Sequence, residues 1–303
     1  MATNFISLVT NVLVARWTEP YNMGVWNIAL LFTVYSPALQ LGVLNGLNRE
    51  LPYLIGTGDK EKSLNMARAS YAWCLILSVL SILVAVGFVI WFWYRGQEKE
   101  CYTSIAIGVM IVCSWLSLYF TTTYRTHAEF GRLAKNTTLV ALVGVAFTLF
   151  VWRFGYFGLM IRAALLAILG VVALYCKRPI PVRPKWDTAL LLHLVRVGLP
   201  IWFLGVMASF FMTMDRLVLA KSPQSLGYYT AAIQVGSFVS MIPIAFTMVL
   251  YPQMSHRYGE THNAMEVWKI AKQGAIGATV LGGVAGICGW LLLPGFVQIL
   301  LPK

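Results

Sequence analysis

The stretch ARASYAWCLILSVLSILVAVGFVIWFWY (Ala67–Tyr94) carries no charged residue after Arg68. An α-helix needs about 20 mostly apolar residues to cross the hydrocarbon core of a bilayer, and this stretch is longer than that. The rest of the chain agrees with it. Of its 303 residues, 59% are hydrophobic and only 11% are charged, whereas soluble domains average about 25% charged residues. With a mean hydropathy of +0.72, the sequence predicts a membrane protein.

Apolar runs of this kind recur along the whole chain, so we expect an all-α polytopic membrane protein. We count nine candidate transmembrane helices. They are Phe5–Trp17, Met23–Leu47, Ala67–Tyr94, Cys101–Thr122, Asn136–Trp152, Phe154–Cys176, Gly198–Ala220, Gly227–Leu250 and Gly274–Leu300. The first run is too short to span by itself. Pro37 falls inside the second run, where a membrane helix tolerates a kink that its neighbours can satisfy.

The net charge of +12 is the one feature that suggests a nucleic-acid partner. However, the basic residues lie in short gaps between apolar runs, and anionic lipid headgroups explain such spacing better. The gaps after runs two, four, six and eight hold most of the 23 basic residues. By the positive-inside rule, these gaps and the N-terminus are cytoplasmic. We therefore expect a multi-pass protein of the cytoplasmic (inner) membrane and no nucleic-acid partner.

The sequence also repeats itself weakly at a long interval. VLVAR (Val12–Arg16) matches LVLAK (Leu217–Lys221), and after a short turn MGVW (Met23–Trp26) matches LGYY (Leu226–Tyr229). Two copies in the same membrane orientation predict a two-lobe helical bundle with a parallel internal repeat.

This repeat predicts three parts of the chain. Residues 1–178 form an N-terminal six-helix lobe whose first helix is shortened. Residues 179–197 form a basic, proline-rich cytoplasmic linker, and residues 198–303 form a C-terminal lobe with its first three helices only.

Three stretches carry a family resemblance: GVLNGLNRELPYLIGTGDKEKS (Gly42–Ser63), MDRLVLAKSPQSLGYYTAA (Met214–Ala232) and IPIAFTMVLYPQMS (Ile242–Ser255). With them the chain resembles the polysaccharide-transporter branch of the multidrug/oligosaccharidyl-lipid/polysaccharide flippase superfamily. The resemblance implies two lobes of helices that face each other across a central cavity. Measured against that plan the second lobe is incomplete, so we expect the chain to be a fragment or a truncated reading frame.

The resemblance also implies the substrate and the partners. The substrate would be an oligosaccharide repeat unit on a polyprenyl pyrophosphate, flipped to the outer leaflet for cell-surface polysaccharide biosynthesis, including lipopolysaccharide. Further partners would be membrane lipids and a glycan polymerase or other polysaccharide-assembly proteins.

Ionisable residues inside a membrane are costly and mark functional sites by default. If helix seven starts at Gly198, Asp215 and Arg216 lie about 25 Å along a core of about 30 Å. Either they line the outward mouth of the cavity, Asp215 as a proton or cation site and Arg216 as an anion contact, or they are anchors. In the second case Arg216 reaches the headgroups and Asp215 pairs with a neighbouring helix. Arg162, inside the sixth run, either holds a pyrophosphate or reaches the headgroups.

Other polar candidates lie on the second and eighth runs. Arg49 and Glu50 end the second run, beside Asn45. They either admit a headgroup from the cytoplasmic side or form a salt-bridged helix end. The amides of Gln40, Asn45 and Gln234 suit sugar contacts and hydrogen bonds between helices equally well.

No nucleophile–base pair, metal-ligand cluster or cofactor loop emerges from the sequence, because the five cysteines and four histidines are scattered. We therefore expect no enzyme, no cofactor and no metal, but a flippase that works by alternating access. Two alternatives stay open. One is an ion-coupled multidrug exporter of the same superfamily, which would need an acidic residue deep in its cavity. The other is a non-transporting scaffold partner of a glycan-synthesis complex.

Overall fold

The computed structural model describes residues 2–56, 58–127, 129–230, 232–234, 236–237, 250, 254 and 263–300. Within them every regular element is a helix, which confirms the predicted all-α class. The elements are α1 (Ala2–Trp17), α2 (Pro20–Tyr35), the 3-10 helix η1 (Ser36–Gln40), α3 (Val43–Gly56), α4 (Lys60–Tyr94), α5 (Glu98–Thr126), α6 (Phe130–Cys176), α7 (Thr188–Leu219) and α9 (Ala264–Leu300). Residues 223–230, after α7, are also helical.

Among the described residues, five helices are long and apolar enough to cross a membrane: α4, α5, α6, α7 and residues 264–291 of α9. The bent pair formed by α2 with η1 and α3 makes a sixth candidate. The 47 residues of α6 include the fifth and sixth predicted runs, and the helical geometry is interrupted at Gly155, which has a φ of 56°. The run Gly227–Leu250 falls largely outside the described residues, so the count of nine spans stays a prediction.

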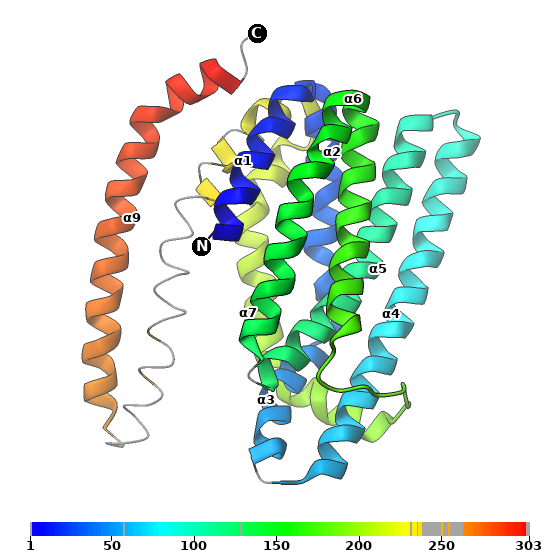
Figure 1. Cartoon of the computed structure of the whole chain (residues 1–303), viewed down its shortest axis with the longest axis vertical. Helices are drawn as coiled ribbons and strands as arrows, with labels where there is room; N and C mark the ends of the chain where they lie inside the picture. The colour runs from blue at the N-terminus through cyan, green and yellow to red at the C-terminus, as the bar shows by residue number, and fades with distance from the viewer. Residues whose placement is uncertain are drawn as a thin grey trace.

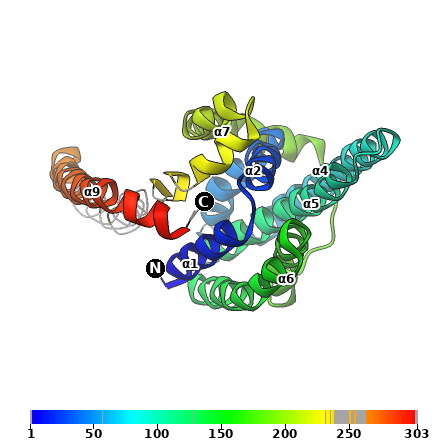
Figure 2. The same ribbon diagram turned by 90° about the horizontal axis from the view of Figure 1, so that it is seen from above.

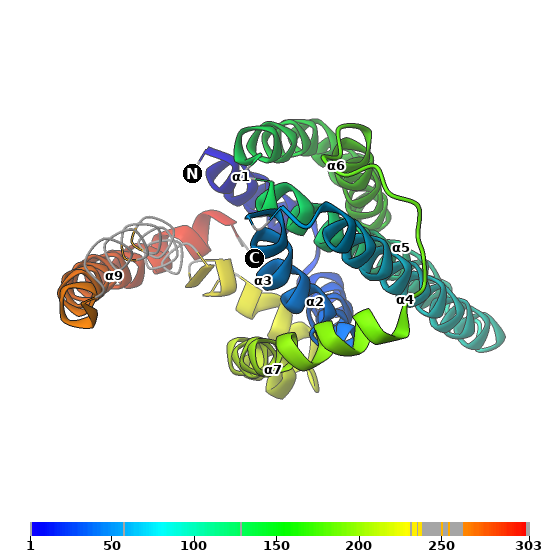
Figure 3. The same cartoon turned by 90° about the horizontal axis from the view of Figure 1, so that it is seen from below.

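The helices surround α2 and α3, as the views along the bundle show (Figure 2, Figure 3). Helices α1 and α6 lie on one side of this centre and α7 lies on the other. The α4–α5 hairpin extends outward, and α9 stands apart from the rest (Figure 1). The closest packing is between α4 and α5, α5 and α6, α3 and α7, and α1 and α6.

A core of buried side chains fixes α3 against α4, α5 and α7. The side chains of Trp115, Tyr119 and Tyr124 on α5 are fully buried. The Tyr119 hydroxyl donates to the carbonyl oxygen of Ala67 at 3.1 Å, and that of Tyr124 donates to Leu174 at 3.1 Å. Buried tyrosines with satisfied hydroxyls lock the relative heights of the three helices they join. Leu47 and Leu51 of α3 are fully buried in the same core, which therefore also holds α3 in position.

Outward faces of the bundle are apolar and open. In the most apolar windows of α4 and α9, only 11% and 6% of the residues are buried within the protein. Such large apolar surfaces would be unstable in water, but lipid chains cover them in a bilayer. The exposed faces confirm a multi-pass membrane protein.

The connection between α6 and α7, which carries Lys177, Arg178, Arg183 and Lys185, lies beside the α3–α4 turn at the lower end of the bundle in Figure 1, here called the basic end. There the backbone N–H of Lys185 donates to the carbonyl of Arg68 at 3.4 Å, and Trp186 packs against Trp73. Within the predicted linker, residues 179–187 are non-helical and α7 begins at Thr188. The division of the chain into two lobes and a linker stays a prediction.

The two copies of the predicted repeat touch each other reciprocally. A Cβ added to Gly24 would collide with the carbonyl oxygen of Pro223, and a Cβ added to Gly227 would collide with that of Pro20. The repeat aligns Gly24 with Gly227 and, at the same offset, Pro20 with Pro223. Reciprocal contacts between equivalent residues are what a two-fold relation produces. This packing supports the parallel repeat.

Candidate functional site

The second predicted span is broken in its middle, between α2 and α3. Pro37 has no N–H to bond to the carbonyl of Thr33, and the hydroxyl of Ser36 donates to that carbonyl instead, at 3.1 Å. The chain then passes through two left-handed residues, Leu41 with a φ of 54° and Gly42 with a φ of 85°. The helix axis bends by 55° across this break. A left-handed leucine costs about 1–2 kcal/mol, and such strain is typical of functional segments.

Below the break, α3 packs on α7 at very close range. A Cβ at Gly198 would collide with the carbonyl oxygen of Gly42, and a Cβ at Gly46 would collide with that of Leu194. Gly42 and Gly46 form a small-xxx-small pair, which lets two membrane helices bring their backbones together. The glycines therefore hold the break against α7.

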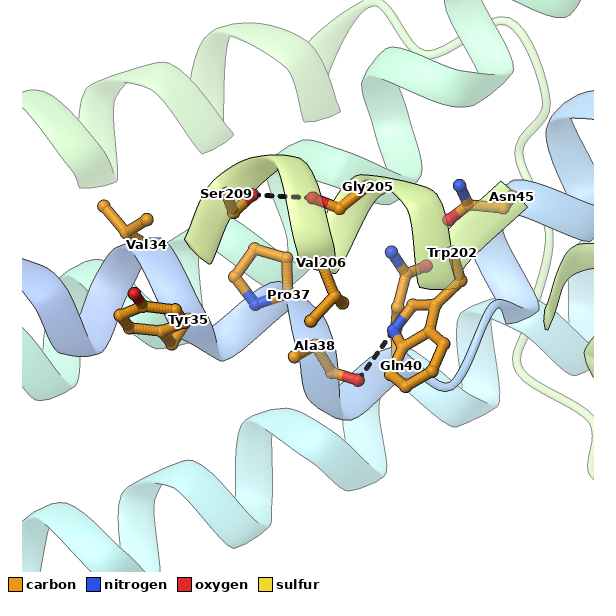
Figure 4. Close-up of a pocket in the computed structure, with 10 residues that line it drawn as sticks. All are labelled: Val34, Tyr35, Pro37, Ala38, Gln40, Asn45, Trp202, Gly205, Val206 and Ser209. Atoms are coloured by element: carbon orange, nitrogen blue, oxygen red, sulfur yellow. Dashed lines mark hydrogen bonds between the residues drawn. The ribbon is translucent and has the colours of Figure 1, made fainter. Parts of the chain in front are cut away.

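A cavity of about 170 Å³ lies between the break and α7 (Figure 4). Helix α2, η1 and α3 form one wall and α7 forms the other. The lining residues are Val34, Tyr35, Pro37, Ala38, Gln40, Asn45, Trp202, Gly205, Val206 and Ser209. The cavity is smaller than the about 300–1,000 Å³ of most ligand sites, but it shares their mostly apolar lining with a few convergent polar groups.

Several polar groups of the cavity are already engaged within the protein. The indole Nε1–H of Trp202 donates to the carbonyl of Ala38 at 2.8 Å, and the hydroxyl of Ser209 donates to Gly205 at 2.9 Å. Oε1 of the buried Gln40 accepts from the backbone N–H of Leu44 at 3.0 Å. These bonds fix the walls rather than offer contacts to a ligand.

Two amide groups remain available. The Nε2 group of Gln40 and the side-chain amide of Asn45 have no hydrogen-bond partner among the described residues. An Asn amide offers two donor hydrogens and one acceptor oxygen, so it can bond to a hydroxyl in either direction. Because none of the ten lining residues drawn in Figure 4 is charged, the cavity suits a neutral ligand rich in hydroxyls.

Of the eight predicted site residues, the structure brings Gln40 and Asn45 together in this cavity. Arg49 and Glu50 lie further along α3, toward the basic end. Oε2 of Glu50 lies 3.5 Å from Nε2 of His193 on α7, an ion pair whenever the histidine is protonated. This contact supports the salt-bridged helix end over a headgroup entry point.

The other four predicted residues lie elsewhere. Nε–H of Arg162 donates to the carbonyl of Gly144 at 3.5 Å, a contact between the two arms of α6 that meet at Gly155. Asp215 and Arg216 lie near the end of α7, where Oδ2 of Asp215 accepts from the hydroxyl of Tyr229 at 2.8 Å. The Nε2 group of Gln234 donates to the carbonyl of Asn11 on α1 at 3.3 Å. Their contacts with substrate stay predictions.

Sequence reasoning missed Tyr35, Trp202 and Ser209, which complete the cavity. All three stand inside apolar runs, where an aromatic or a serine is typical of helix packing. The available signal was Pro37: a proline in the middle of a span predicts a break, and a break exposes polar backbone that a facing helix must satisfy.

Apolar helices around a broken span, with a small uncharged cavity at the break, define a multi-pass membrane protein. A solved structure described as the inward-facing conformation of a multidrug resistance MATE family transporter of the MOP superfamily matches with a TM-score of 0.65. The match covers 97% of this chain and 72% of that chain at 18% identity, so it shows the fold alone.

The profile of the family described as polysaccharide biosynthesis protein matches residues 13–273, and the chain belongs to that family. A comparison with curated proteins found no match. The predicted resemblance is thereby confirmed.

Proposed function

We propose that the chain flips a lipid-linked oligosaccharide, a repeat unit on a polyprenyl pyrophosphate, across the cytoplasmic membrane by alternating access. The observation that carries this proposal is the uncharged cavity with two available amides at the break of helix two. Sugars present hydroxyl groups that both donate and accept, and the amides of Gln40 and Asn45 match them. The family name, polysaccharide biosynthesis protein, supports a glycan substrate.

In this proposal each wall of the cavity contacts a different part of the sugar. Asn45 and the free Nε2 group of Gln40 bind the hydroxyls of one sugar, and the indole ring of Trp202 lies against its apolar ring face. Because the Trp202 ring is held at Ala38, it needs little reordering when a sugar arrives, which lowers the cost of binding. The strained break between η1 and α3 is the segment suited to change shape as the lobes rock.

The orientation is part of the same proposal. The basic connections and the N-terminus face the cytoplasm, in keeping with the positive-inside rule. The two lobes are residues 1–178 and 198–303, joined by the linker 179–197. Membrane lipids surround the exposed faces, and polysaccharide-assembly enzymes act on the flipped product.

The main alternative is an ion-coupled multidrug exporter, since the structural neighbour is described as a multidrug resistance transporter. An exporter coupled to protons or cations needs an acidic residue in its cavity, where the carboxylate can exchange its ion. The described lining of the cavity holds no acidic residue, and Asp215 accepts a hydrogen bond from Tyr229 near the end of α7. This arrangement favours the flippase.

The test is a flipping assay in reconstituted vesicles that carry a fluorescent lipid-linked oligosaccharide. We expect the protein to move the oligosaccharide between leaflets, so that an added glycosidase or quencher reaches nearly all of it. A fluorescent hydrophobic cation, offered to the same vesicles with and without an ion gradient, reports the exporter activity. Oligosaccharide that stays on its original leaflet would contradict the flippase proposal. A non-transporting scaffold would then be the remaining function.

A further inference from the structure

A second cavity lies on the opposite face of the broken span. Its volume is about 480 Å³, and it is a groove between α2 with η1 on one side and the α4–α5 hairpin on the other. Its lining is nearly all aliphatic or aromatic, including Phe32 on α2 and Leu80, Val84 and Phe88 on α4. These four side chains are exposed, so the groove is open to the surroundings of the protein.

The hydroxyl hydrogens in the groove are already used within the protein. Ser81 donates to Leu77 at 2.7 Å and accepts from the indole of Trp115 at 3.0 Å. Thr103 donates to Lys99 at 2.7 Å, and Ser104 donates to Glu100 at 2.8 Å. The hydroxyl of Ser36 is bonded to Thr33. With these groups satisfied, the groove presents an apolar wall whose charged lining residue, Glu100, stands at the start of α5.

The length of the groove limits what can fill it. Its lining residues on α4 run from Trp73 to Phe92, which is about 28 Å along a helix that rises 1.5 Å per residue. The hydrocarbon core of a bilayer is about 30 Å thick, so a phospholipid acyl chain in one leaflet reaches about half of it. A single chain that fills this groove has to be longer than an ordinary acyl chain.

The groove also shares a wall with the candidate sugar site. Pro37, Ala38 and Gln40 of η1 line the sugar cavity, whereas Ser36 and Leu39 of the same short helix line the groove. The indole of Trp73, in the groove, donates to the backbone carbonyl of Gln40 at 3.2 Å. The small cavity with its two amides and the apolar groove therefore lie on two faces of one short helix, an arrangement that suits an amphiphile.

We propose that the groove between α2, α4 and α5 binds the isoprenoid chain of the lipid carrier while a sugar of the same substrate occupies the cavity across η1. The inference rests on the proposed function, because the flipped molecule supplies both parts. A long isoprenoid chain has the length and the apolar character that the groove requires. Binding it along the protein keeps the chain beside the break through which its head passes.

The test is photolabelling of the whole protein in lipid nanodiscs with a long-chain polyprenyl phosphate that carries a diazirine near the end of its chain. Mass spectrometry of the peptides locates the label. We expect labels on α4 and on Phe32 of α2, well above those on the exposed apolar face of α9. A phospholipid with the same diazirine is expected to label both regions equally. Equal labelling of α4 and α9 by the polyprenyl probe, or groove labelling by the phospholipid of the same strength, would overturn the proposal.

Matched variants sharpen the test. Leu80→Trp and Val84→Trp place a bulky ring in the groove, whereas Leu83→Trp and Val86→Trp place it on exposed parts of α4 outside the groove. We expect the first two to lower polyprenyl labelling of the groove about tenfold, because a blocked groove loses the burial of several CH₂ groups. The second two should label like the parent protein. All four positions are exposed, so the fold tolerates the change, and equal labelling of all four contradicts the proposal.

Labelling does not require transport, so the two proposals fail separately. If the groove is labelled but no oligosaccharide is moved, the chain-binding proposal stands and the flippase proposal is wrong. If oligosaccharide is flipped but the groove is not labelled, the flippase proposal stands and the chain-binding proposal is wrong.

Discussion

The side-chain amide of Asn45 lies at the edge of the sugar cavity without a hydrogen-bond partner in the described part of the chain. Asn45→Leu keeps the volume and removes the donors and the acceptor. A sugar hydroxyl left without a partner costs about 1–3 kcal/mol, so we expect flipping to slow about tenfold or more. The vesicle assay with fluorescent lipid-linked oligosaccharide measures the flipping rate of the variant and of the parent protein.

Asn48 provides the matched control, because it lies one turn along α3 and is exposed. Asn48→Leu makes the same chemical change outside the cavity and should leave the flipping rate unchanged. Equal rates for the two variants would show that the Asn45 amide does not contact the substrate.

Trp202 offers an aromatic ring face to the cavity and donates a hydrogen bond to Ala38. Two substitutions separate these two contributions. Trp202→Phe keeps an aromatic face but loses the bond to Ala38, which costs about 1 kcal/mol of stability. Trp202→Leu loses both. We expect the Phe variant to unfold at a lower temperature in detergent yet still flip oligosaccharide, and the Leu variant to lose most activity. Loss of flipping in the Phe variant as complete as in the Leu variant would contradict a role for the ring face.

Single residues of the site were only partly predictable from the sequence. Gln40 and Asn45 stand out because amides are costly inside an apolar run. Trp202 does not stand out, since its partner Ala38 is 164 residues away in the sequence and no periodicity connects them. The charged candidates were chosen only because a charge in the membrane is costly. That cost does not show which way a side chain points: Arg162 contacts Gly144 on the facing arm of α6.

Among the elements, the contact of α3 with α7 sets the shape of the cavity. Gly198→Ala adds a methyl group where the backbone of Gly42 already lies, and overpacking of this kind costs about 1–3 kcal/mol. We expect the variant to have a lower melting temperature in detergent and a slower flipping rate. Gly170→Ala in α6 is the control, because a Cβ there meets nothing within 4 Å. An equal melting temperature for Gly198→Ala and the parent would mean that the two helices separate easily.

The elements show how far apolar length alone can predict a fold. The spans α4, α5 and α7 could be predicted from the sequence without knowledge of their packing, since each apolar run is long enough to cross the bilayer core. The run Met23–Leu47 also met that criterion, yet it folds as α2, η1 and α3. Pro37 marks a kink in the sequence, but the 55° break also needs the left-handed Leu41, a conformation that side-chain hydropathy does not encode.

In the whole molecule, the two copies of the repeat meet where α2 and residues 223–230 begin. Nδ2 of Asn27 donates to Oγ1 of Thr230 at 2.7 Å, and the two residues are 203 positions apart. The alignment of Gly24 with Gly227 makes Asn27 and Thr230 equivalent, so each residue contacts its own counterpart. Such a contact lies on the two-fold axis that relates the copies. The repeat could be read from the sequence, but the self-contact of its two copies required the structure.

This self-contact leads to a prediction about the transport cycle. If the lobes rock about a central site, contacts on the axis at one end of the bundle must part to let the substrate leave. A short thiol crosslinker applied to the double variant Asn27→Cys/Thr230→Cys should therefore stop flipping, and a cleavable form of it should restore flipping on reduction. The single variants, which retain the native cysteines, should keep their activity under the same treatment. Full activity in the crosslinked protein would instead show that the copies stay joined here and that the lobes open at the α3–α7 crossing.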